Sequence, residues 1–124
     1  MGIDSIEFGS ITIDGRRYAH DVVVYPEKVE RRKKHISKEE HGTSHKFSRN
    51  EILEYLKGLD LHEIKLVVVG TGQYGKLSLL DETKKVLEDE DIEVIEVRTP
   101  EAIRKFNSDD VSRKEKIGIF HVTC

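Results

Sequence analysis

The chain has 124 residues, of which 36% are charged and 36% are hydrophobic, and its formal net charge is −3. This length predicts a single domain, residues 1–124, whose core needs neither disulfides nor a structural metal. The single cysteine excludes an intramolecular disulfide, and no apolar run approaches the roughly 18 residues that a membrane span needs.

The first segment predicts a β-hairpin. Residues 6–13 alternate loosely between apolar and polar side chains and end in Asp14-Gly15, which is a strong hairpin turn signal. Residues 18–25 form the second expected strand, which Pro26 halts. We therefore expect these two strands to pair antiparallel, with Val22–Val24 buried on both faces.

Residues 28–48 differ in character from the rest of the chain. They carry the main basic cluster of the chain, within residues 28–38, and three of its six histidines, with few apolar side chains between them. A short edge strand near Val29 is compatible with this pattern, but most of the segment is expected to be loop. A loop of this length inside a compact domain is usually functional or mobile.

A helix is predicted to begin at a capping box. In Ser48-Arg49-Asn50-Glu51, the serine hydroxyl can accept from the Glu51 N–H while the glutamate reaches back to the serine N–H. An apolar stripe follows, and Gly58 is a plausible stop. Residues 64–69 are apolar except for Lys65, and such a run is typical of a central strand covered on both faces.

The second half of the chain alternates between helices and strands. Residues 81–90 predict a helix and residues 92–97 a strand. Another helix should begin at Thr99 as N-cap, with Pro100 at the first helical position. The last strand is expected over residues 117–123. This order predicts an α/β fold in which parallel strands neighbour one another and helices pack on the sheet.

A glycine-rich motif, Gly70-Thr71-Gly72-Gln73-Tyr74-Gly75, matches G-x-G-x-x-G and follows a predicted strand. Glu96 lies where a ribose-binding acid would stand in a dinucleotide site. Two expected strands precede this unit, however, and residues 76–79 alternate, which favours a helix start near Asp81. The motif is therefore interpreted either as an anion or small-ligand site or as a tight turn at the end of a strand.

Two further pairs contain candidate site residues. His121 and Cys124 would point to opposite faces of a continued strand, so a Cys–His pair would need another histidine such as His20. The alternative for Cys124 is a small buried thiol. His20 and Asp21 interrupt an apolar strand, and a buried aspartate needs partners, so they are either site residues or structural hydrogen-bonding groups.

Residues 28–48 contain two more candidate sites. His41 and His45 have the four-residue spacing of zinc ligands on a helix, but the glycine, threonine and serine between them favour a solvated loop. The basic residues 31–35 could grip the phosphates of a nucleic acid, although glutamates flank them and no aromatic residue is interleaved. A solvated charged loop is the default interpretation of this cluster.

Several short segments also resemble a known family, in the same order and spacing along the chain: Phe8-Gly9-Ser10-Ile11, Tyr18-x-His20-Asp21-Val22-Val23-Val24, Gly70-Thr71-Gly72, Glu93-Val94, Thr99-x-x-Ala102 with Phe106-Asn107, and His121-x-Thr123-Cys124. The chain is similar to the small single-domain family that includes the adipogenesis-associated domain protein and a mitochondrial complex I assembly factor. It looks like an uncharacterised archaeal or bacterial type of member, and its many lysines and glutamates hint at a heat-adapted source.

The resemblance implies a three-layer α/β fold, with a mixed central β-sheet flanked by helices and an additional N-terminal β-hairpin. It also implies that the glycine loop is not a dinucleotide site, and it assigns no catalytic residue, metal or cofactor to the chain. The two roles associated with the family, complex I assembly and adipogenesis-linked signalling, look like protein-interaction functions.

The leading hypothesis is a non-enzymatic binding or assembly module that acts through a protein partner. The start of the chain has no basic or arginine-rich targeting pattern, and a lone cysteine suits a reducing compartment, so a cytoplasmic protein is expected. The first alternative is a small-ligand or anion binder, or an enzyme, built from Gly70, Thr71, Gly72, His20, Asp21, His121 and Cys124. The second alternative is a nucleic-acid binder that uses residues 31–34.

Overall fold

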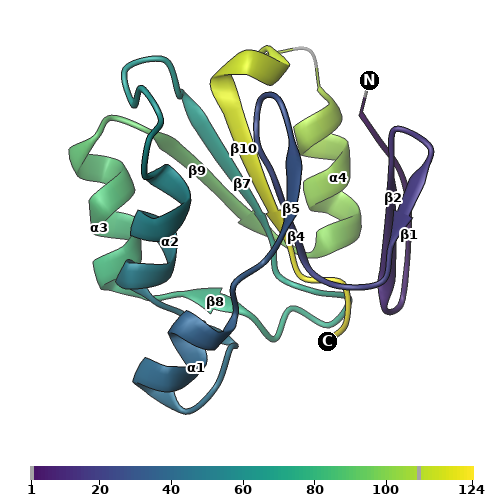
Figure 1. The fold of residues 1–124 in the computed structure, drawn as a ribbon, viewed down its shortest axis with the longest axis horizontal. Coiled ribbons are helices and arrows are strands. Elements are labelled where there is room, and N and C mark those ends of the chain that lie inside the picture. The colour runs from purple at the N-terminus through teal and green to yellow at the C-terminus, as the bar shows by residue number, and fades with distance from the viewer. Residues whose placement is uncertain (1, 109) are drawn as a thin grey trace.

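Apolar strands form a five-stranded mixed sheet at the centre of the computed structural model, which describes residues 2–108 and 110–124 (Figure 1). The strand order is β5-β4-β10-β7-β9, where the strands are β4 (Val22–Val24), β5 (Val29–Arg31), β7 (Leu66–Gly70), β9 (Glu93–Val97) and β10 (Lys116–Phe120). Strand β7 pairs in parallel with both β10 and β9, whereas β4 pairs antiparallel with β10 and β5.

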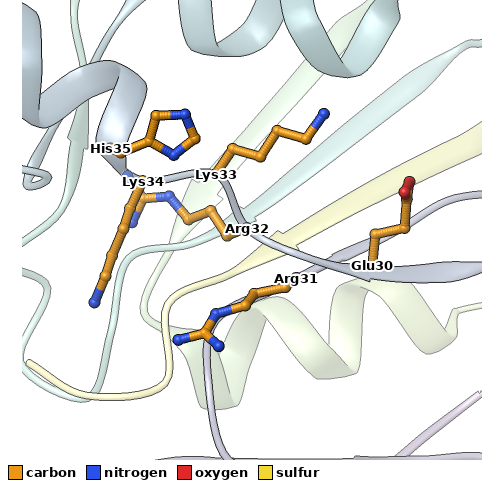
Figure 2. Close-up of a pocket in the computed structure, with 6 residues that line it drawn as sticks. All are labelled: Glu30, Arg31, Arg32, Lys33, Lys34 and His35. Atoms are coloured by element: carbon orange, nitrogen blue, oxygen red, sulfur yellow. The ribbon is translucent and has the colours of Figure 1, made fainter.

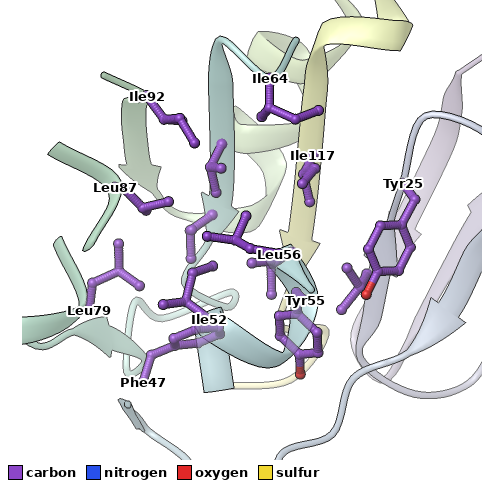
Figure 3. Close-up of a cluster of buried hydrophobic side chains, with 14 of the residues drawn as sticks. Tyr25, Phe47, Ile52, Tyr55, Leu56, Ile64, Leu79, Leu87, Ile92 and Ile117 are labelled. Atoms are coloured by element: carbon purple, nitrogen blue, oxygen red, sulfur yellow. The ribbon is translucent and has the colours of Figure 1, made fainter. Parts of the chain in front are cut away.

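Helices cover both faces of this sheet, because alternate residues of each strand point to opposite sides. Val67 and Val69 face one apolar cluster, together with α2 (Arg49–Leu56) and α3 (Asp81–Asp89), and Figure 3 shows this cluster. Leu66 and Val68 face a second cluster with α4 (Thr99–Asn107). Among the described residues, no helix is long and apolar enough to cross a membrane.

The N-terminal hairpin lies outside α4, on the far side from α2 and α3 (Figure 1). It is a separate three-stranded sheet of β1 (Ile3–Glu7), β2 (Ser10–Ile13) and β3 (Arg16–Tyr18). The predicted turn at Asp14-Gly15 is confirmed, with φ of 50° and 81°. Val22–Val24 is a buried strand as predicted, but its predicted partner is wrong, because it leaves the hairpin and pairs with β10 and β5 in the central sheet.

The prediction of a long loop over residues 28–48 is also wrong. The edge strand near Val29 is present as β5, but it is followed by α1 (His35–His41) and by β6 (Lys46–Phe47), which pairs with β8 (Ser78–Leu79). Helix α1 ends at Gly42, whose φ of 75° is the left-handed C-cap conformation that glycine adopts without strain. Buried polar side chains hold this segment on the core, and these lack the apolar periodicity by which helices are recognised in a sequence.

The two helix starts predicted with a capping residue are each half correct. Ser48 caps α2 by accepting from the Glu51 N–H at 3.0 Å, but Ser37 accepts the Ser48 N–H at 2.9 Å, so Glu51 is not the acceptor that the capping box predicts. Helix α4 begins at Thr99, with Arg98 and not Thr99 as its N-cap. The Thr99 hydroxyl bonds elsewhere, as described below.

The last strand is shorter than predicted. Strand β10 ends at Phe120, and residues 121–124 continue without regular structure. Likewise β7 ends at Gly70 and α3 begins only at Asp81, with β8 in between. The glycine motif is therefore not followed directly by a helix N-terminus. With the helices on both faces and the separate hairpin, the structure confirms the predicted three-layer α/β fold class.

Candidate functional site

The first part of the candidate site is a buried carboxylate, Asp21, which immediately precedes β4. Its Oδ2 atom lies 2.8 Å from Nδ1 of His121, and its Oδ1 atom accepts a hydrogen bond of 2.9 Å from the N–H of Val122. Arg32 donates to Oδ2 through Nη1 at 3.0 Å. Asp21 is only 8% exposed, so these partners replace the water that a carboxylate otherwise requires.

Arg32 extends this network to helix α2. Its Nε and Nη2 atoms donate to the two carboxylate oxygens of Glu51 at 2.8 and 3.0 Å, and Nη2 also donates to the Ser44 carbonyl at 2.7 Å. Glu51 accepts in addition from the hydroxyls of Ser37 and Tyr55. The Arg32 and Glu51 side chains are 0% exposed, so Arg32 is not available to a nucleic-acid phosphate as the sequence suggested.

Burial and charge together set the ionisation of this network. Burial alone would raise the pKa of Asp21, but the hydrogen bond and charge of His121, the N–H of Val122 and the charge of Arg32 lower that pKa to about 2. Burial next to the Glu51 carboxylate raises the pKa of Tyr55, so its hydroxyl stays protonated and donates.

Acid should therefore weaken the fold through Asp21. Its pKa is about 2 in the folded protein against an ordinary value of 3.8, so the stabilisation is complete above pH 3.8 and is lost as the pH falls through about 2. A shift of this size corresponds to about 2–3 kcal/mol. Urea denaturation at a series of pH values should show this loss in the wild type and not in Asp21→Asn. Equal pH dependence of the two proteins would contradict it.

The second part of the site is the glycine loop, which lies against residues 121–124 at Gly72. The φ of Gly72 is +101°, and a Cβ there would lie 2.3 Å from the carbonyl carbon of Cys124 and 2.7 Å from Cδ2 of His121. The Gly72 N–H donates to the Thr99 hydroxyl at 2.8 Å, and this hydroxyl donates to the His121 carbonyl at 2.6 Å. Only glycine allows this backbone conformation and this close approach together.

Three further amides of this loop also bond within the chain. The N–H of Gln73 donates to the Thr123 carbonyl at 2.7 Å, and those of Tyr74 and Lys76 donate to the Cys124 carbonyl at 3.1 and 3.0 Å. A phosphate-binding loop would instead present such N–H groups to its ligand. In this protein they hold residues 121–124 in place.

The predicted ribose-binding acid is likewise engaged within the fold. Glu96 accepts from the Leu79 N–H at 3.0 Å, and its other oxygen lies 3.5 Å from Nζ of Lys84. Glu96 therefore connects β9 with β8 and α3. A dinucleotide site depends on a free acidic side chain for the ribose and on a helix N-terminus directly after the glycine loop. Glu96 is engaged within the fold and α3 begins only at Asp81, so both features are missing.

His121 is enclosed by its neighbours. The His45 ring meets it edge-on, with the centroids 5.3 Å apart, and Nε2 of His121 lies 3.4 Å from the Thr123 hydroxyl. The order carboxylate, imidazole, hydroxyl is that of an activated nucleophile, but His121 is buried and a substrate would have to displace residues 121–124 to reach it. In this conformation the Asp21–His121 pair holds the segment after β10.

The structure brings six of the seven predicted site residues together, namely Gly70, Thr71, Gly72, Asp21, His121 and Cys124. The prediction that His121 and Cys124 are on opposite faces of a strand does not apply, because β10 has ended and both contact Gly72. His20 points elsewhere, with its ring edge-on to Tyr18 at 5.9 Å. The role of these residues in binding a ligand remains a prediction.

The two histidines with the spacing of zinc ligands have different neighbours. His41, at the end of α1, lies 3.8 Å from a Glu82 oxygen on α3, whereas His45 packs on His121. Within residues 2–108 and 110–124, no group of three or more histidine, cysteine, aspartate and glutamate side chains is arranged to hold a metal ion.

A shallow open depression of 590 Å³ lies over the connection from β5 to α1, lined by Glu30, Arg31, Arg32, Lys33, Lys34 and His35. In Figure 2 the Lys33 side chain points to one side, and those of Arg31 and Lys34 point to the other. Lys33 pairs with Glu54 at 2.7 Å. With Arg32 buried and Lys33 paired, the cluster does not present a continuous row of cations to a nucleic-acid backbone.

A surface feature that the sequence analysis missed lies next to the glycine loop. Phe8 and Tyr74 are 60% and 65% exposed, and their ring centroids are 6.3 Å apart. Phe8 is in the turn between β1 and β2, where the Gly9 N–H donates to the Val122 carbonyl at 2.8 Å. The only sequence signal was an aromatic residue directly before a turn glycine in both places, Phe8-Gly9 and Tyr74-Gly75.

Comparisons with known proteins give a family and a fold. A family model described as "Protein of unknown function (DUF498/DUF598)" matches residues 3–120. The conserved hypothetical protein PH1505 from Pyrococcus horikoshii OT3 is 46% identical, with both chains covered over 100% and a TM-score of 0.87. A structure named MT938 is 31% identical, with a TM-score of 0.77, over 99% of this chain and 98% of its own.

A more distant structure shows the likeness of fold alone. A Bordetella pertussis protein that is described as a Mth938-like domain is 14% identical with a TM-score of 0.68, over 98% of this chain and 85% of its own. No curated protein matches the sequence.

Proposed function

The chain belongs to the DUF498/DUF598 family of proteins of unknown function, and we propose that it is a non-enzymatic module that binds a protein partner. The exposed pair of Phe8 and Tyr74 carries this proposal. Large aromatic side chains in contact with each other and with water are typical of the anchors of protein interfaces. We call Phe8 and Tyr74 the aromatic pair.

Both loops of the aromatic pair are fixed by the same segment. The Gly9 N–H bonds to the Val122 carbonyl, and the Tyr74 N–H bonds to the Cys124 carbonyl. Loops whose backbone is already fixed lose little conformational entropy on binding, which favours affinity. The network of Asp21 and His121 thus supports binding indirectly, since it holds the segment on which both loops rest.

The rim of the aromatic pair indicates the chemistry of the partner. Lys76 is exposed two residues after Tyr74, and the exposed Arg98 lies beside Gly75, where a Cβ would be 3.6 Å from its Nε. Cations around an apolar centre suit a partner segment with an apolar side chain flanked by carboxylates. The partner proposed is therefore a protein with an acidic segment of this kind.

The resemblance to the family of the adipogenesis-associated domain protein and the complex I assembly factor supports an interaction function, and we also propose a cytoplasmic location. The two rival functions have less support. The loop amides of Gly72, Gln73, Tyr74 and Lys76 bond within the chain and not to an anion. The basic cluster of residues 31–34 contains a buried arginine and a paired lysine.

The test is a quantitative affinity purification with the tagged wild type and the double variant Phe8→Ser/Tyr74→Ser. We expect a stoichiometric partner to be retained by the wild type and reduced at least tenfold with the variant, because loss of one interface anchor costs about 2 kcal/mol or more. The double variant Lys76→Glu/Arg98→Glu should also reduce the recovery of this partner, because the segment that it is proposed to present is acidic.

Leu53→Ser provides a matched control. Leu53 is exposed apolar surface on α2, 37% exposed, away from the aromatic pair, so this variant should retain the partner like the wild type. Thermal unfolding must show that all variants remain folded. Equal recovery of the partner with the wild type and the Phe8/Tyr74 variant, or no partner at all in repeated experiments, would disprove the proposal.

A further inference from the structure

Strand β9 is at one end of the central sheet and has an unpaired edge among the described residues. Its Glu93 N–H donates to the Lys65 carbonyl at 3.0 Å, and its Val97 carbonyl accepts from the Thr71 N–H at 2.9 Å. In a parallel ladder alternate residues bond to the same neighbour, so Glu93, Ile95 and Val97 bond toward β7. Val94 therefore directs its N–H and C=O away from the sheet, as Glu96 also does.

The surface is hollowed on both sides of this edge. A depression of 400 Å³ between α3 and β9 is lined by Lys84, Glu88, Ile92, Glu93, Val94 and Glu96. A second depression, of 160 Å³, lies on the other face beside Ile95 and α4. Val94, Ile95 and Val97 are half-buried, so apolar surface remains exposed along the edge. An edge of this kind is a template for another strand.

We propose that β9 pairs antiparallel with β9 of a second copy of this chain, centred on Ile95, and joins the two five-stranded sheets. In this register Val94 of one copy is opposite Glu96 of the other, and these are the residues whose N–H and C=O point outward. The two copies therefore exchange backbone hydrogen bonds symmetrically, as a twofold interface requires.

The charges of the edge suit this register. Glu93 is opposite Val97, and Glu96 is opposite Val94, so no carboxylate faces another carboxylate directly across the strands. Lys84 lies level with Glu96, 3.5 Å away, and Glu88 follows one turn later on α3. Because the second copy runs in the opposite direction, Lys84 of each α3 lies level with Glu88 of the other α3. These opposite charges attract each other.

The opposite edge of the sheet is protected against such pairing. Strand β5 has only three residues, and its Glu30 is paired with Lys28 at 3.1 Å. Short, charged edge strands discourage association. Strand β5 nevertheless supplies a matched control. The Arg32 N–H donates to the Asp21 carbonyl, so these two residues form a hydrogen-bonded pair. Such pairs alternate with non-hydrogen-bonded pairs along an antiparallel ladder, and Val29, three residues earlier and opposite Val24, is in a non-hydrogen-bonded pair. The Val29 N–H therefore also points outward.

The experiment compares Val94→Pro with Val29→Pro. Each removes one outward N–H of a half-buried valine on an edge strand, without removing a bond within the sheet. Sedimentation equilibrium over a concentration series should give a dimer for the wild type and for Val29→Pro. Val94→Pro should raise the dissociation constant at least tenfold.

A monomeric wild type at every concentration would overturn the proposal, and so would an unchanged dimer in Val94→Pro. If Val94→Pro does not fold, hydrogen exchange of the wild type decides. The amides of Val94 and Glu96 should be protected at high protein concentration and exchange faster on dilution. Fast exchange of both amides at high concentration would overturn the proposal equally.

Discussion

We expect replacement of Arg32 by methionine to lower the free energy of unfolding by about 3–5 kcal/mol. Methionine keeps much of the side-chain length but leaves the carboxylates of Asp21 and Glu51 buried without their shared cation. The cost arises from these uncompensated charges more than from the lost hydrogen bonds. Urea denaturation followed by circular dichroism measures the effect.

Lys33→Met is the matched control for this prediction, because it removes the same charge one residue later. Lys33 pairs with Glu54 on the surface, where solvent screens the interaction, so its denaturation midpoint should stay close to that of the wild type. Adding Asp21→Asn to Arg32→Met should recover part of the loss by removing one buried charge. Equal midpoints for Arg32→Met and Lys33→Met would show that the buried network does not stabilise the fold.

Gly72→Ala is expected to destabilise the protein by roughly 2–6 kcal/mol. The left-handed backbone conformation contributes about 1–3 kcal/mol of this, and overpacking by the added methyl group contributes about 1–3 kcal/mol more. The added methyl group would overlap the carbonyl carbon of Cys124, at 2.3 Å, and the ring of His121, at 2.7 Å. Residues 121–124 would have to move away from the glycine loop. Denaturation gives the energy, and limited proteolysis should show faster cleavage near this segment.

Gly75→Ala separates the two causes. Gly75 is in the same loop with φ of +71°, but a Cβ there would have its nearest neighbour at 3.6 Å, on Arg98. This variant therefore introduces the backbone strain without the overlap, and it should lose only about 1–3 kcal/mol. If the two alanine variants were equally stable, the close approach at Gly72 would have no energetic importance.

The sequence predicts those parts of the fold that depend on local signals. Apolar runs locate β7 and β10, and the Asp14-Gly15 turn and the Ser48 cap are placed correctly. Val22–Val24 is recognisable as a buried strand but is assigned the wrong partner, because an apolar run does not indicate which strand pairs with it. The choice depends on β10, which lies almost a hundred residues later.

The site is harder to predict, because its polar contacts join distant parts of the chain. Asp21 stands out as a charge within an apolar strand, but nothing near Arg32 distinguishes it from the exposed arginine before it. A local capping rule assigns the Glu51 carboxylate to the Ser48 N–H. In the structure this carboxylate binds Arg32, which lies 19 residues earlier. Charged residues over 28–48 suggest a solvated loop, yet Arg32, Ser37 and Ser48 within that segment are buried.

The position of β10 has a consequence for how the chain folds. This strand lies between β4 and β7, so residues 116–120 complete the middle of the sheet although they come last among its strands. The Asp21–His121 contact closes a loop of 100 residues. Such non-local pairing slows folding. While the chain is being synthesised, β4 and β7 have no strand between them, and a cooperative sheet forms only after β10 has emerged.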